Sequence, residues 1–133
     1  MRAQISVDFI IASIAVMIMF SLIFNLYAEK NRGINTIMAS LEAERIGEKL
    51  AWGINDVARA GDGAKTDIII PETILGEGYY AYVEGRWVDV TWHHGGVENH
   101  LSFPLMTSNT KKGMIEPGSH LTIMNIGGKI HVS

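Results

Sequence analysis

The hydrophobic positions of this chain change their spacing twice, and the first pattern is an unbroken apolar run. Residues 9–28 carry no charge, and the polar side chains between Phe9 and Leu26 are Ser13, Ser21 and Asn25. As a helix with a rise of 1.5 Å per residue, this stretch extends about 27 Å, close to the hydrocarbon thickness of a bilayer. The run is apolar on every face, so we predict a hydrophobic helix over residues 4–28, membrane-spanning or packed among other helices.

A helical period continues beyond the apolar run, now with charged side chains on the other faces. It predicts an amphipathic stalk over residues 29–62, with the helix ending near Ala60 because Gly61-Asp62-Gly63 follows. We expect the second half of the stalk to pack on this protein's own sheet. The apolar positions are Ile34, Ile37, Met38 and Leu41 in the first half, and Ile46, Leu50, Ile54 and Val57 in the second.

Three glycines, Gly33, Gly47 and Gly53, fall inside the predicted stalk. Each costs roughly 1 kcal/mol relative to Ala in a helix interior. They could mark packing points, bends or a melted stretch, and the sequence leaves these alternatives open.

In residues 63–133 the period shortens to about two, which is typical of half-buried strands. We predict five or six short antiparallel strands and no second helix. The fold class is therefore α+β: a long N-terminal helix, anchor plus stalk, followed by a small antiparallel β-sandwich or open barrel. The expected strands are Asp67–Ile70, Tyr79–Val83, Trp87–Trp92, Val97–Phe103, Leu121–Ile126 and Lys129–Val132, with His93-His94-Gly95-Gly96 as one turn and Gly127-Gly128 as another.

Composition narrows the possible functions. The 133 residues suffice for one exterior domain plus an anchor, and the absence of Cys excludes disulfides and thiolate metal sites. The net charge of −3, with no basic stripe, gives no reason to expect a nucleic-acid partner.

The residues do not assemble into a catalytic or metal-binding group. His93 and His94 are adjacent, with Glu98 and His100 nearby, but neighbouring residues in a strand point to opposite faces, and zinc needs about four converging ligands. A polar hairpin tip is the favoured interpretation. We expect no enzyme activity, no cofactor and no metal.

The N-terminus carries a polar register directly before the apolar run. Arg2 precedes the small residue Ala3, and Gln4-Ile5-Ser6-Val7-Asp8 then leads into Phe9. This arrangement resembles the class III signal peptide of archaeal type IV pilin-like proteins, in which a short basic leader and a small residue precede Q-x-S-x-E and a hydrophobic helix. The chain departs from that pattern at Asp8, where the family usually has Glu. The segments Ile68–Tyr80 and Pro117–Asn125 also look, more loosely, like the globular part of such proteins.

The resemblance implies how the chain is processed and assembled. A prepilin peptidase would recognise Arg2, Ala3, Gln4, Ser6 and Asp8 and remove the leader 1–3 by cutting between Ala3 and Gln4. Gln4, Asp8 and Phe9 would then act in assembly. The expected partners are the membrane, a pilus assembly ATPase with its membrane platform, and copies of itself or related pilins. The product would be a pilin-like lollipop, with its N-terminus cytoplasmic and its β domain extracellular, in a surface filament that can serve adhesion.

Two other interpretations stay open. The chain could be a processed but non-polymerising surface binding protein, or an accessory component of the archaeal motility filament. It could also be an uncleaved single-pass anchor with an unrelated exterior domain, in which Gln4, Ser6 and Asp8 are simply interfacial polar residues.

Overall fold

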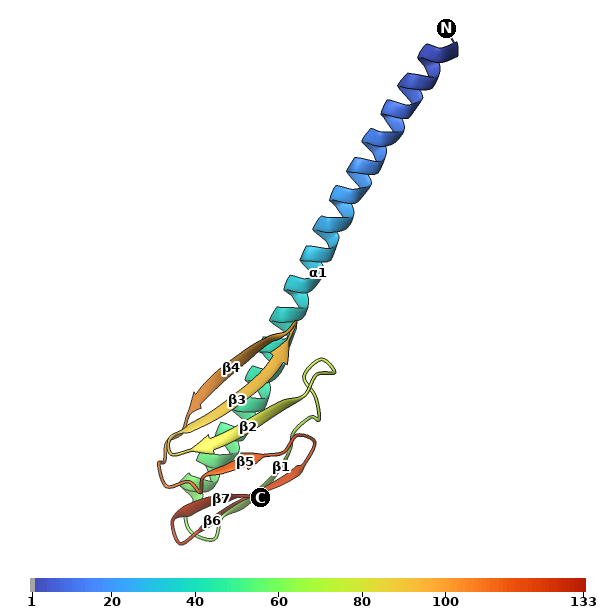
Figure 1. The fold of residues 1–133 in the computed structure, drawn as a ribbon. Helices are drawn as coiled ribbons and strands as arrows, with labels where there is room; N and C mark the ends of the chain where they lie inside the picture. Colours follow the sequence, from blue (N-terminus) through green and yellow to red (C-terminus); the bar gives the residue numbers. More distant parts are fainter. Residues whose placement is uncertain (1) are drawn as a thin grey trace. The chain divides into compact units, whose positions relative to one another are not determined.

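The computed structural model describes residues 2–133, which form one helix and seven strands (Figure 1). Met1 lies outside the described residues, and so do the side chains of Arg2, Ala3 and Ile5. The elements are α1 (Arg2–Ala60), β1 (Lys65–Ile69), β2 (Tyr79–Glu84), β3 (Trp87–His94), β4 (Val97–Pro104), β5 (Gly113–Ile115), β6 (His120–Ile126) and β7 (Lys129–Val132).

Internal contacts divide the chain into two compact units, one ending at Thr36 and the other comprising Ile37–Ser133. The division falls within α1, inside the segment 29–62 that the sequence presents as one stalk. The helix itself has 59 residues and ends at Ala60, as predicted. Gly61 follows with a φ of 89°, a left-handed conformation that commonly terminates helices.

The second unit contains two antiparallel sheets, ordered β1-β6-β7 and β4-β3-β2-β5. The segment before β5 links them, because Lys111 N donates to Ile130 O at 2.8 Å and Ile130 N donates to Asn109 O at 2.9 Å. β1 and β4 lie at opposite ends of this order, so the described strands close no barrel. The predicted α+β fold, a long N-terminal helix followed by a small antiparallel β domain, is confirmed.

All six predicted strands are present, with bounds that differ by at most two residues. The structure also differs from the prediction in one further strand and in one turn. β5 was not predicted, because three residues are too short to show a period of two. β3 continues through His94, so the predicted four-residue turn is wrong: Gly95 and Gly96 alone make it, with φ of 61° and 80°. Two positive φ values are what a primed hairpin turn requires. Gly127 and Gly128 form the predicted turn of the same kind, with φ of 61° and 82°.

The core of the second unit lies between α1 and the inner faces of both sheets. The second apolar stripe of the stalk is buried there, as predicted, with exposed fractions of 0–3 %. The predicted inner face of β3, comprising Val88, Val90 and Trp92, is buried as well. The stripe of α1 in this core is Ile46, Leu50, Ile54 and Val57.

The three glycines of the helix have different surroundings. A Cβ at Gly47 would overlap the Phe103 ring of β4, and one at Gly53 would lie 2.8 Å from Ile123 Cδ1 of β6. Both are packing points, one against each sheet. At Gly33 nothing lies within 4 Å of such a Cβ.

We expect Gly47→Ala to lower the free energy of unfolding by about 1–3 kcal/mol, because the added methyl group overpacks the contact with Phe103. Gly33→Ala is the matched control and should raise helix stability by up to about 1 kcal/mol, since Ala is the better helix former and nothing crowds the site. Denaturant unfolding of the full chain in detergent, followed by tryptophan fluorescence and circular dichroism, measures both. Equal effects of the two substitutions would contradict the close packing at Gly47.

Candidate functional site: the exposed apolar helix

The predicted processing and assembly residues lie at the beginning of α1. Among them, Gln4, Ser6 and Asp8 are exposed, and Phe9 is 72 % exposed. Gln4 and Asp8 are one helical turn apart, so they share a face. The side chains of Arg2 and Ala3 lie outside the described residues, and the structure does not test the predicted cleavage.

Behind this polar register, the first unit presents apolar side chains in every direction. All the large apolar side chains from Val7 to Tyr27 are between 53 and 73 % exposed. Burying a side chain of this size contributes about 1.5–3 kcal/mol. A continuous surface of this length is far larger than the apolar patches that monomeric soluble proteins expose.

The helix is long and apolar enough to cross a membrane. Its most apolar window of 18 residues has a mean hydropathy of 2.5, and none of that window is buried within the chain. Two of the polar side chains in this stretch turn back onto the helix: Ser13 Oγ donates to Phe9 O, and Asn25 Nδ2 donates to Ser21 O, both at 2.8 Å. Such bonds satisfy these donors without water, which lowers the cost of placing them in lipid or in a packed core.

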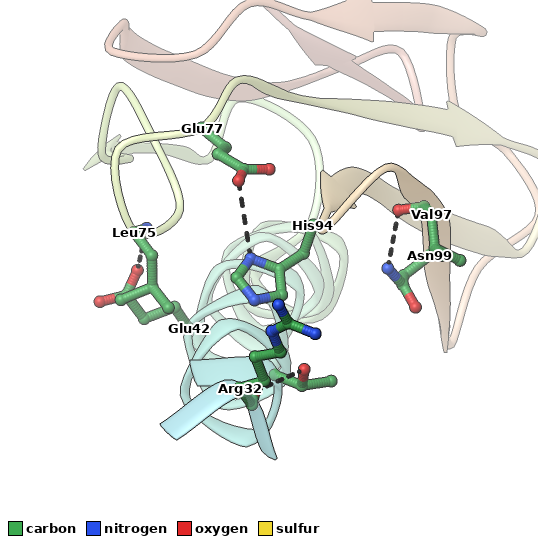
Figure 2. Close-up of polar contacts among 8 residues, drawn as sticks. Arg32, Glu42, Leu75, Glu77, His94, Val97 and Asn99 are labelled. Carbon is green, nitrogen blue, oxygen red and sulfur yellow. Dashed lines mark hydrogen bonds and ion pairs between the residues drawn. The ribbon is translucent and has the colours of Figure 1, made fainter. Parts of the chain in front are cut away.

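In the second unit, the histidine cluster singled out in the sequence does not converge. His93 Nε2 lies 3.2 Å from Glu98 Oε2, whereas His94 Nδ1 lies 3.7 Å from Glu77 Oε1 (Figure 2 shows the second pair). The two imidazoles thus face different carboxylates, as alternation along a strand predicts. Within residues 2–133, no group of three or more His, Asp or Glu side chains is arranged to hold a metal ion.

Polar side chains of α1 also attach loops of the β domain, a role that the sequence did not reveal. Glu42 Oε2 accepts a hydrogen bond from Leu75 N at 3.1 Å, and Asn55 Oδ1 accepts one from Met106 N at 2.8 Å (Figure 2 shows the first). Leu75 adopts a φ of 50°, a conformation that costs a non-glycine residue energy and persists where its surroundings hold it. Only the partners, which lie 33 and 51 residues away, distinguish these two side chains from ordinary surface residues.

The same loop is held from β2. Tyr79 is 5 % exposed, and its hydroxyl donates to Pro71 O at 2.5 Å. Burial raises the pKa of Tyr79 to about 12, because the phenolate would lose its hydration. The loop 70–78 is therefore attached to both α1 and β2.

Compared with known proteins, the chain matches no family model, no curated protein and no solved structure. Its function must therefore be argued from its own residues.

Proposed function

We propose that this chain is a structural subunit, a major or minor pilin, of an archaeal type IV pilus-like surface filament. A prepilin peptidase removes Met1–Ala3, and the assembly ATPase and its membrane platform transfer the mature subunit from the membrane into the filament. The proposal combines the N-terminal pattern with one structural observation: the apolar surface of α1 continues beyond the length that a bilayer requires.

That observation favours a filament subunit over a simple anchor. About 20 apolar residues span a bilayer, and a plain anchor would end its apolar surface at the interface. Here the next apolar stripe, which follows the charged residues Glu29 and Lys30, is still exposed. Its members are Ile34 at 42 %, Ile37 at 63 %, Met38 at 51 % and Leu41 at 53 % exposure. Outside a membrane, other helices are the partners that would cover it.

The physical cost of such a transfer is small. A helix that is apolar all round exchanges lipid contacts for contacts with equivalent helices, so little burial is lost. The Ser13 hydroxyl and an amide N–H of Asn25 already donate to the helix backbone, so these donors need no new partner in either environment. Subunits would then be held by their helices, with the β domains on the outside of the filament.

Electron microscopy of cells that lack this chain tests the proposal. A major subunit predicts that a class of surface filaments disappears, and that expression of the chain restores it. A minor subunit predicts fewer or shorter filaments of that class, with the chain recovered in the sheared fraction. Unchanged filaments, together with a chain found exclusively in the membrane fraction, would favour the non-polymerising anchor.

A further inference from the structure

The outer face of α1 in the second unit carries two ridges of opposite charge. Successive residues of an α-helix are rotated by about 100°, so Glu44 and Glu48 form one ridge and Arg45 and Lys49 form a second beside it. All four side chains are exposed. The same rotation per residue places Leu41 and Trp52 between the two ridges. Their side chains are 53 and 74 % exposed.

None of these four charges takes part in an ion pair among the described residues. Lys49 Nζ donates one hydrogen bond to Ile69 O at 2.6 Å, which leaves its charge unpaired. Each ridge places like charges four residues apart, which disfavours an isolated helix, and Arg45 and Glu48, three residues apart, offset part of that repulsion. An opposite charge on another molecule would relieve the rest.

We propose that this face binds the same face of a second copy of the chain, with the two helices parallel. When two parallel helices meet, the left flank of one contacts the right flank of the other; when they are antiparallel, equal flanks meet. The acidic ridge of one copy therefore contacts the basic ridge of its neighbour only when the two helices are parallel. In an antiparallel pair, acid would face acid.

Two grooves lie beside the ridges. One groove passes between α1 and the loop at Leu75, alongside Leu41, and another passes between α1 and β1, alongside Trp52. An exposed Trp next to a groove and flanked by complementary charges is a typical anchor of a protein interface. Because the same face is used by both copies, both ridges of each copy are occupied in the pair, and the contact is closed by a two-fold axis parallel to the helices.

The inference rests on the proposed function for its partner, a second copy of the chain. It adds the surface through which the copies bind and their parallel orientation.

The test uses the full chain with Ser133→Cys, labelled with donor or acceptor dye and reconstituted in liposomes at low protein density. Energy transfer between copies measures association. We expect Glu44→Lys with Glu48→Lys to weaken association at least tenfold, and the same for Arg45→Glu with Lys49→Glu. A one-to-one mixture of the two variants should restore it, because all-basic and all-acidic faces then meet.

Two controls keep the result specific. Glu98→Lys with Glu116→Lys raises the net charge by as much as the acidic-ridge variant does, at exposed positions outside α1, and should leave association unchanged. Thermal unfolding verifies that each variant is folded. If Arg45→Glu with Lys49→Glu does not fold, because the Lys49 bond to Ile69 is lost, Arg45→Glu alone takes its place. In the wild-type chain, carbodiimide coupling of light- and heavy-isotope copies should join Lys49 of one to Glu44 or Glu48 of the other.

Wild-type copies that do not associate, or charge variants that associate as the wild type does, would overturn the inference. In the latter case, the disappearance of filaments from cells lacking the chain would still support the proposed function. Conversely, complementation between the variants combined with unchanged filaments in such cells would keep the parallel contact and overturn the filament proposal.

Discussion

A fragment that begins at Ala64 is expected not to fold, whereas one that begins at Ala28 should be soluble and unfold cooperatively. The shorter fragment lacks Ile46, Leu50, Ile54 and Val57, whose side chains are 0–3 % exposed in the core. At about 1.5–3 kcal/mol each, their burial amounts to about 6–12 kcal/mol, which is comparable to the whole stability of a typical domain. Both sheets would expose their inner faces as well.

Circular dichroism and thermal unfolding of the two fragments measure this difference. Leu50→Ala in the longer fragment is a milder change in the same core. It should lower the free energy of unfolding by about 2–5 kcal/mol, because it leaves a cavity at a fully buried position. An Ala64 fragment that melts at the same temperature as the Ala28 fragment would refute the packing of α1 on the sheets.

Asp8→Ala should abolish or strongly reduce filaments, on the order of tenfold or more, without unfolding the protein. After the proposed cleavage, the new amino group of Gln4 lies one turn from Asp8, where an acidic side chain is also favoured by the helix dipole. In a packed core this carboxylate would neutralise the amino group of its own or a neighbouring chain. Removing it leaves a charge unpaired, at a cost of several kcal/mol.

Asp8→Glu restores the residue usual in the resembled family and should be tolerated. Glu29→Ala is the matched control, because it removes an exposed carboxylate from the same helix outside the N-terminal turn. Filament yield in the sheared fraction is the measurement, with the unassembled subunit assayed in membranes. A normal yield from the Asp8→Ala strain would remove the proposed assembly role of this residue.

The sequence predicted those parts of the fold that repeat with a period. The stripe from Ile46 to Val57, the inner face of β3 and the helix end at Ala60 each follow from local spacing and a breaking residue. The parts that it missed depend on partners far along the chain. Gly47 has no recognisable role until Phe103 lies against it, and Glu42 is an ordinary surface charge until Leu75 reaches it.

The candidate site could be predicted in part. The apolar run is visible in the sequence because its composition alone defines it, and its large side chains are exposed in the structure. The charge ridges beside Trp52 were not recognised, since the sequence shows charges on the outer faces of the stalk without showing which of them remain unpaired after folding. That distinction needs the positions of the sheets and loops around the helix.

The mature N-terminal residue tests the central claim most directly. Intact-mass analysis and N-terminal sequencing of the protein extracted from membranes of cells that contain the peptidase should give Gln4, free or cyclised, as the first residue. That result would mean that Met1–Ala3 is removed in front of the apolar helix and that the helix is retained for assembly. Intact Met1 under the same conditions would contradict processing as a pilin and leave an uncleaved single-pass anchor.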